Sequence, residues 1–272
     1  MEFHQKLTEV KRWEISRYLL NQENPRRAWK KFIETERFPV DCEEISFELL
    51  EKLKQNEIKV IPFYDRSYPC GFKNLSNPPL LLFLKGNASL LGRKKKVAII
   101  GARSSSCTLR EYARHVSRYL SSRNLTVISG YALGIDESAH KGALEEKGST
   151  IAVLGKGLLH NMKRNYTNLF KEITRKGLLI SEKAPLNNVK PQDFLLRNRL
   201  IASLAENFII INPAFRSGSY SLLCMAKKLN KKIIVIFEKD ERIPEYLLKG
   251  NFGRIPIFDN LLEAKMLFDM LA

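Results

Sequence analysis

The sequence predicts an α/β protein built on a doubly wound, mostly parallel sheet. From Lys96 onward, short apolar runs rich in β-branched residues alternate with amphipathic stretches, a pattern typical of strand–helix–strand units. The apolar runs contain few polar residues, as expected for strands that helices cover on both faces. With 272 residues and 44% hydrophobic content, the chain is large enough to bury such a core. The predicted class is therefore a Rossmann-like fold, in which ligands bind at the carboxyl ends of the strands.

Two domains are expected along the chain. Residues 1–58 carry apolar residues at helical spacing and nearly balanced charges, which predicts a small N-terminal helical domain. Residues 59–272 form the second domain, which begins with a lead-in segment, 59–92, whose prolines break any helix before a short strand. Beyond the lead-in, we expect strands at 97–101, 126–130, 150–155, 178–181, 208–211 and 233–237, and helices at 109–122, 135–147, 165–176, 197–206 and 219–229.

The positive charge of the chain is concentrated in its middle. Of 46 Lys and Arg against 29 Asp and Glu, residues 93–199 hold 21 against 8, a net charge of +13, whereas the segment on each side carries +2. Such a local excess favours a polyanion as the partner. The apolar runs are far shorter than the roughly 20 residues that span a bilayer, and the N-terminus lacks the apolar core of a secretion signal. We therefore expect no membrane association and a cytoplasmic location.

The first predicted strand ends in a turn suited to an anion. Gly101 permits a tight turn, and Arg103 and Ser104 supply hydrogen-bond donors beside exposed backbone N–H groups. Because Arg103 occupies the third position of the turn, the segment departs from G-x-G-x-x-G, which disfavours a dinucleotide cofactor. The alternative is an ordinary Gly-Ser turn with a solvated arginine.

The second strand leads into SGYALGIDESAH, which contains Ser129, Gly130, Gly134, Asp136 and His140. The two glycines permit close backbone approach, and the Asp and His fall at i and i+4 on one helix face. Such a pair could serve acid–base catalysis or metal binding. Structural hydrogen bonds are the favoured interpretation, because the sequence offers no third ligand and no nucleophile.

The segment after the third strand combines charge with an aromatic ring. Lys163 and Arg164 lie beside Tyr166, a combination suited to phosphate contact and base stacking. A solvated loop is the alternative interpretation.

The segment VKPQDFLLRNRL places further basic residues at the start of a helix. Arg197 and Arg199 cannot both lie on the buried stripe of that helix, and Lys190 and Phe194 precede them. We expect these four residues to contact nucleic acid.

A last turn, between the fifth strand and its helix, contains Arg216 followed by Ser217, Gly218 and Ser219. Its hydroxyl and N–H groups form a second potential anion site. All of these segments follow strands or open helices, so a doubly wound sheet gathers them on one edge. Arginines, glycines, hydroxyls and aromatic rings gathered in this way favour single-stranded nucleic acid as the ligand.

Taken together, these motifs resemble those of the DNA processing protein A family (DprA, also called Smf). The matching pieces are YPCGFKNLSNPPLLLFLKG, VAIIGAR, SGYALGIDESAH, IAVLGKGL, FLLRNRLIA and RSGSYS, in the order of the family. The resemblance implies an extended Rossmann fold without catalysis, cofactor or metal. It also implies a cytoplasmic homodimer that binds single-stranded DNA, protects it and helps to load RecA recombinase during natural transformation. The implied DNA-binding positions are Gly101, Arg103, Ser104, Lys163 or Arg164, Lys190, Phe194, Arg197, Arg199, Ser217, Gly218 and Ser219.

The chain departs from the family pattern at three places. Met162 and Lys163 replace a usual Tyr-Pro, Asn212 or Pro213 replaces an acidic residue after the fifth strand, and IFEKD replaces a V-P-G ending of the last strand. The chain ends at Ala272, so we expect no C-terminal winged helix.

Two alternatives to DNA binding remain open at this stage. The first is a Rossmann-like hydrolase or transferase acting on a nucleotide or nucleotide-sugar phosphate, with Asp136, His140 or Glu182 as acid or base. The P-G-G-x-G-T motif typical of such hydrolases is absent. The second is a partner-recruitment module that kept the fold without DNA affinity.

Overall fold

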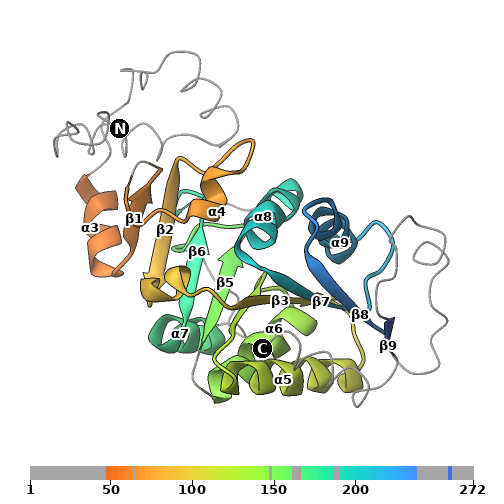
Figure 1. The fold of residues 1–272 in the computed structure, drawn as a ribbon. Helices are drawn as coiled ribbons and strands as arrows, with labels where there is room; N and C mark the ends of the chain where they lie inside the picture. Colours follow the sequence, from red (N-terminus) through yellow and green to blue (C-terminus); the bar gives the residue numbers. More distant parts are fainter. Residues whose placement is uncertain are drawn as a thin grey trace.

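The computed structural model describes residues 47–63, 65–146, 149–160, 167–186, 190–237 and 257–258. Within these ranges, helices and strands alternate along most of the chain (Figure 1). The helices are α3 (Phe47–Gln55), α4 (Cys70–Lys73), the 3₁₀ helix η2 (Ala88–Gly92), α5 (Cys107–Ser122), α6 (Ile135–Glu145), α7 (Thr167–Lys176), α8 (Pro191–Leu204) and α9 (Gly218–Lys228). The strands are β1 (Lys59–Pro62), β2 (Leu81–Gly86), β3 (Lys96–Gly101), β4 (Thr126–Ser129), β5 (Thr150–Leu154), β6 (Leu178–Ser181), β7 (Asn207–Ile211), β8 (Lys232–Ile236) and β9 (Ile257–Phe258).

The described strands form one sheet in the order β1-β2-β6-β5-β4-β3-β7-β8-β9. From β6 to β9 every neighbouring pair is parallel, whereas β2 runs antiparallel to both β1 and β6. The chain starts the parallel part at β3, builds outward to β6 on one side, and then returns to build β7 and β8 on the other side. Such a reversal between β3 and β7 is a topological switch point, where ligands of doubly wound sheets bind.

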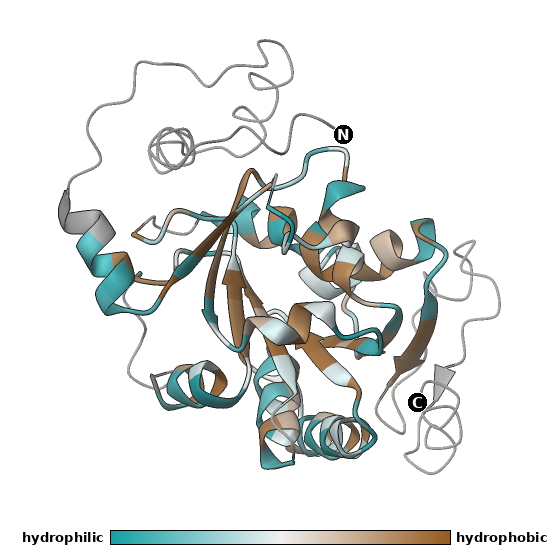
Figure 2. Cartoon of the chain, turned by 60° about the vertical axis from the view of Figure 1, so that its left-hand side comes forward, coloured by the Kyte–Doolittle hydropathy of each residue, from teal (hydrophilic) through white to brown (hydrophobic). Residues whose placement is uncertain are grey.

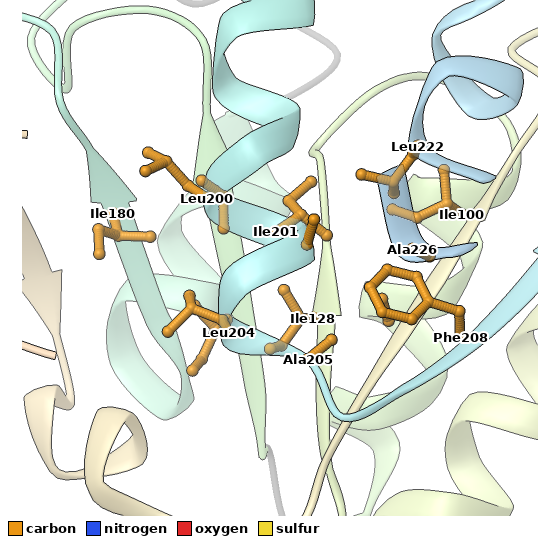
Figure 3. Close-up of a cluster of buried hydrophobic side chains, with 14 of the residues drawn as sticks. Ile100, Ile128, Ile180, Leu200, Ile201, Leu204, Ala205, Phe208, Leu222 and Ala226 are labelled. Atoms are coloured by element: carbon orange, nitrogen blue, oxygen red, sulfur yellow. The ribbon is translucent and has the colours of Figure 1, made fainter. Parts of the chain in front are cut away.

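Helices cover both faces of the sheet (Figure 2), with α5, α6 and α7 on one face and α4, α8 and α9 on the other (Figure 1). Alternate residues of β3 pack on opposite faces of the sheet. Val97 and Ile99 pack with the α5–α6 side, and Ala98 and Ile100 pack with the α8–α9 side. This burial on both faces explains why the strand sequences are continuously apolar. Figure 3 shows the α8–α9 core, in which α8 and α9 side chains meet the sheet (Leu200, Ile201, Leu204, Leu222, Ile100, Ile128).

The predicted fold class is confirmed, and two details of the prediction are corrected. Helix α8 begins at Pro191 rather than at Arg197, because Pro191 opens the helix and the Asp193 carboxylate accepts a hydrogen bond from the Lys190 N–H at 2.8 Å. The lead-in segment was expected to end in one short strand, but it forms two, β1 and β2, which extend the sheet.

The predicted helical domain lies mostly outside the described residues. Helix α3 is the described part of it, and residues 1–46 lie outside the described residues. Among the helices that the structure describes, none combines the length and the apolar character needed to cross a membrane.

Candidate nucleic-acid interface

An exposed arginine stacks on an aromatic ring at the carboxyl edge of the sheet. Arg103 follows β3, and its guanidinium carbon lies 4.9 Å from the centroid of the Phe194 ring on the first turn of α8. Gly155, at the end of β5, leaves room for that ring, since a β-carbon there would lie 3.2 Å from Phe194 Cδ1. The Arg103–Phe194 pair therefore presents a positive charge and a half-buried ring side by side.

The backbone that carries Arg103 is fixed by the neighbouring loop. Gly134 adopts φ +80°, and a β-carbon there would lie 2.5 Å from the Arg103 carbonyl oxygen. The Ile135 N–H also donates to the Ala102 carbonyl at 3.4 Å. The turns after β3 and β4 are therefore packed against each other, and Gly134 is required for this contact.

The structure places Arg197 in the interior, at 5% exposure. Its Nη1 donates to the carbonyl oxygens of Gly130, after β4, and of Val153, in β5. A β-carbon on Gly130 would lie 2.5 Å from that Nη1, so this glycine makes room for the guanidinium. Arg197 thus joins α8 to the ends of two central strands, near enough to the exposed Arg103 for the two charges to interact.

Asp136 compensates the buried charge of Arg197. Its Oδ2 accepts hydrogen bonds from the N–H groups of Gly130 at 3.1 Å and Ala132 at 3.4 Å. Burial raises the pKa of Asp136, and the positive charge of Arg197 opposes that rise. Burial lowers the pKa of Arg197 to about 10, Asp136 raises it, and nearby Arg103 lowers it. Arg197 therefore stays charged at neutral pH, and Asp136 offsets its charge inside the fold.

His140 is a structural side chain in this arrangement. Its Nδ1 lies 2.7 Å from Thr150 Oγ1, whose hydroxyl donates to the Val127 carbonyl at 3.0 Å. The Thr150 oxygen therefore accepts from a protonated Nδ1. Burial, followed by the charge of Arg197, lowers the pKa of His140 to about 3, so the ring is neutral near pH 7. The described residues contain no cluster of His, Cys, Asp and Glu able to hold a metal ion.

Arg199 lies further along α8 and pairs with the Glu182 carboxylate at the end of β6. Burial raises the pKa of Glu182, and the Arg199 charge opposes this rise. Next to it, Lys183 forms an ion pair with Asp193 at 2.6 Å, and both side chains are buried. These two pairs anchor α8 to the end of β6.

The turn after β7 uses its hydroxyls to start a helix. Ser217 Oγ accepts from the Tyr220 N–H at 3.1 Å and lies 2.8 Å from Ser219 Oγ. The Gly218 carbonyl accepts from Asn198 Nδ2 of α8 at 3.0 Å. The predicted Ser-Gly-Ser site is therefore a cap for α9 that is also tied to α8.

The remaining predicted positions divide into surface and strand-end residues. Ser104 and Lys190 are exposed at the carboxyl edge, whereas Ser129 Oγ is buried and donates to the Ile99 carbonyl at 2.7 Å. Gly101 is tightly packed, because a β-carbon there would lie 2.4 Å from the Ile211 carbonyl oxygen. Met162, Lys163 and Arg164 lie outside the described residues.

Phe215 was not among the predicted site residues, and it is 53% exposed in the turn after β7. The guanidinium carbon of Arg216 lies 5.3 Å from its ring centroid. An aromatic residue directly before an arginine, just beyond a strand, is the signal that could have identified it.

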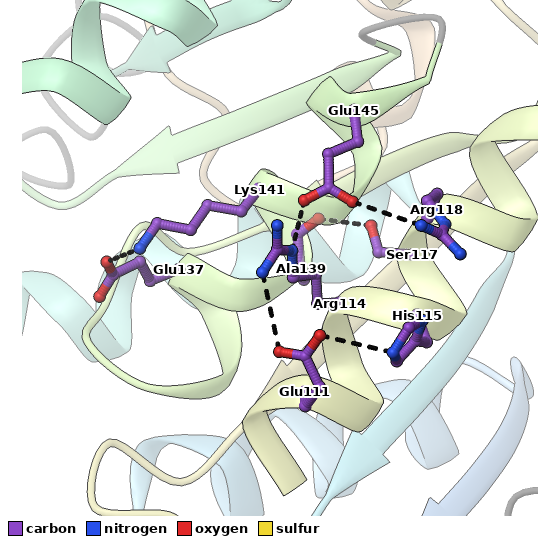
Figure 4. A network of polar contacts seen from close by, with 9 residues as sticks. All are labelled: Glu111, Arg114, His115, Ser117, Arg118, Glu137, Ala139, Lys141 and Glu145. Atoms are coloured by element: carbon purple, nitrogen blue, oxygen red, sulfur yellow. Dashed lines mark hydrogen bonds and ion pairs between the residues drawn. The ribbon is translucent and has the colours of Figure 1, made fainter. Parts of the chain in front are cut away.

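Other basic residues of the charge-rich middle segment are paired on the α5–α6 surface (Figure 4). Arg114 contacts the carboxylates of both Glu111 and Glu145, and Arg118 lies 3.9 Å from Glu145. Lys141 pairs with Glu137 at 2.6 Å. These cations are balanced by acidic neighbours.

Comparisons with known proteins agree with this architecture. Residues 59–251 match the family model described as DNA recombination-mediator protein A. DNA processing protein DprA of Bacillus subtilis (strain 168) is 28% identical over 188 residues, which cover 69% of this chain and 63% of that protein. Its counterpart in Streptococcus pneumoniae (strain ATCC BAA-255 / R6) is 36% identical over 157 residues, which cover 57% of this chain and 54% of that protein. The chain thus spans between half and two thirds of the length of these curated relatives.

Two solved structures are similar over most of the chain. DprA from Streptococcus pneumoniae superposes with a TM-score of 0.73 at 25% identity, covering 96% of this chain and 98% of that one. DNA processing protein A from Helicobacter pylori, whose structure was described for its single-stranded DNA binding mode, gives a TM-score of 0.68 at 27% identity and covers 79% of this chain and 95% of that one. The family model spans well over half of the sequence, so the chain belongs to the DNA recombination-mediator protein A (DprA/Smf) family.

Proposed function

We propose that this protein binds single-stranded DNA, without chemical catalysis, at the carboxyl edge of its sheet. The observation that carries the proposal is the Arg103–Phe194 pair, an exposed guanidinium 4.9 Å from an aromatic centroid. Single-stranded DNA requires this combination, because phosphates bind cations and bases stack on rings. The single-stranded DNA binding mode described for the Helicobacter pylori relative supports the same ligand.

The residues of the interface take different roles in this proposal. Arg103 contacts a phosphate, Phe194 stacks on a base, and Ser104 and Lys190 add donors at the exposed edge. Lys163 and Arg164 remain proposed DNA contacts by their position in the family motif. Other predicted residues support the interface by holding the strand ends, α8 and α9 in place (Gly101, Arg197, Arg199, Ser217, Gly218, Ser219).

A hydrolase or transferase is not proposed. Asp136, at 4% exposure, accepts hydrogen bonds from backbone N–H groups, and His140 is buried against Thr150. Glu182 is buried in its ion pair with Arg199. Acid–base catalysis requires a group within hydrogen-bond reach of the substrate, and these three side chains are turned inward. Release of base from nucleoside monophosphates, abolished by Asp136→Ala, would revive the hydrolase.

The proposal extends to partners on the basis of family membership. We assign the protein to the cytoplasm, as a homodimer that protects incoming single-stranded DNA and helps to load RecA during natural transformation. The test is the rate of RecA filament formation on DNA covered with a single-strand-binding protein. We expect the protein to accelerate filament formation. If the protein itself retains RecA in a pull-down but binds no single-stranded DNA, the result would instead support a recruitment module.

DNA binding is tested by titrating a fluorescent oligothymidylate at several salt concentrations. Neutralising phosphates releases counterions, so affinity should fall steeply as salt rises. A duplex of the same length provides the comparison for strand preference. An affinity that does not change with salt, or an absence of binding at low salt, would contradict the proposed function.

A further inference from the structure

The switch point of the sheet is flanked by two turns, and each presents an arginine beside an aromatic ring. Gly101, at the end of β3, lies opposite Ile211, at the end of β7, in the parallel pairing of these strands. The turn after β3 carries Arg103, and the turn after β7 carries Phe215 and Arg216. Because the two strands are neighbours, the two turns emerge next to each other at the carboxyl edge.

The turn after β7 holds its aromatic ring outward. Phe215 is 53% exposed, Arg216 lies over its ring at 5.3 Å, and the Tyr220 ring meets it edge-on at 5.2 Å between centroids. Arg216 adopts the left-handed conformation, with φ 59°, as does Asn212, with φ 45°. Residues with a β-carbon rarely adopt this conformation, and such positions cluster at ligand sites.

Helix α8 contacts both the turn after β3 and the turn after β7. Its first turn carries Phe194, and Asn198, one turn later, donates to the Gly218 carbonyl at the start of α9. The Ser217 cap then fixes the beginning of α9 directly after Arg216. The aromatic rings on both sides of the switch point are thus held on one connected frame.

We propose that Phe215 and Arg216 form a second nucleotide-binding site for single-stranded DNA. It lies across the switch point from the first site, the Arg103–Phe194 pair. A base stacks on Phe215, and Arg216 contacts the adjoining phosphate. The inference rests on the proposed function. It adds the path of the DNA, which then runs across the carboxyl ends of β3 and β7. Charge complementarity and continuity with the Arg103–Phe194 pair favour this occupant over a protein partner for the exposed ring.

The test compares Phe215→Ala with the parent protein on oligothymidylates of increasing length. We expect about a tenfold loss of affinity for oligonucleotides of about ten nucleotides, which are long enough to occupy both nucleotide-binding sites. For oligonucleotides of about three nucleotides the loss should stay under about twofold, because the Arg103–Phe194 pair still binds them. Phe215→Tyr, which keeps a stacking ring, should restore the affinity. The matched control is Leu229→Ala, which removes a 48% exposed apolar side chain beyond the other end of α9.

A direct readout of stacking comes from Phe215→Trp. Base stacking quenches indole fluorescence, so this variant should lose emission when a long oligothymidylate binds, beyond any change in the parent. Equal affinities of the parent and Phe215→Ala at every oligonucleotide length would overturn the second nucleotide-binding site while leaving the proposed DNA binding intact. An equal loss of affinity at every length would do the same. A parent protein that binds no oligonucleotide would instead overturn the proposed function itself.

Discussion

The α5–α6 surface and the carboxyl edge both contain arginines, but they use them differently. On the α5–α6 surface, Arg114 and Arg118 face the carboxylates of Glu111 and Glu145 (Figure 4). At the carboxyl edge, Arg103 lies over an aromatic ring, and so does Arg216. Within the residues that the structure describes, neither of these two guanidinium groups forms an ion pair with an acidic side chain.

The difference shows that a charge excess alone does not locate a binding surface. Residues 93–199 carry a net charge of +13. Part of that charge is balanced by neighbouring carboxylates, and part is buried, as in Arg197. A polyanion gains most from cations that have no acidic neighbour to displace, and Arg103 and Arg216 at the carboxyl edge are two such cations.

The largest expected effect is on the free energy of unfolding, when the loss of a buried carboxylate is compared with the loss of an exposed one. Asp136→Ala leaves the Arg197 charge buried without its partner, which should lower the free energy of unfolding by about 3–5 kcal/mol. Glu145→Ala, the matched change on the α5–α6 surface, should cost under about 1 kcal/mol because its partners remain solvated. Urea denaturation measures both losses.

Asp136→Asn provides a second comparison should Asp136→Ala not fold. The amide oxygen can still accept from the Gly130 N–H, so this variant should retain more stability than Asp136→Ala. Equal losses for the Asp136 and Glu145 variants would show that the carboxyl edge is not supported by a buried charge pair.

A smaller effect is expected in the pH dependence of stability. An unfolded histidine protonates near pH 6.5, whereas burial lowers the pKa of folded His140 to about 3. Between these values only the unfolded chain binds the proton, so stability is lost as the pH falls below about 6.5. The loss from this group between pH 7 and pH 5.5 should be about 1 kcal/mol.

His140→Gln isolates that contribution, because every other titrating group is retained. Its free energy of unfolding should change less between pH 7 and pH 5.5 than that of the parent, by about 1 kcal/mol. Parallel pH profiles for the two proteins would show that His140 is accessible to protons in the folded state.

Much of the fold was predictable, because burial on both faces forces the parallel strands to be apolar along their whole length. The start of α8 was not. Its core-facing side near the N-terminus carries Asp193, Arg197 and Asn198, which are buried polar residues with partners in the fold. Hydrophobic spacing could not identify these turns as helical, although Pro191 and Asp193 give a helix-start signal.

The candidate site was predictable in its location and less so in its individual residues. Strand ends gather at one edge in any doubly wound sheet, which placed Arg103 and Phe194 together. Which arginine of the R-N-R segment is buried depends on tertiary contacts. The carbonyls of Gly130 and Val153 that receive Arg197 lie 67 and 44 positions away in the sequence. No local pattern carries that information.

The most direct test of the difference between the two surfaces is the salt dependence of oligothymidylate binding by Arg103→Ala and Arg114→Ala. Both variants lose one arginine, so their net charges are equal. We predict that Arg103→Ala reduces the slope of log affinity against log salt by about one phosphate contact, whereas Arg114→Ala keeps the slope of the parent. Equal slopes for both variants would mean that DNA responds to the overall charge of the protein, and would contradict a binding site at the carboxyl edge.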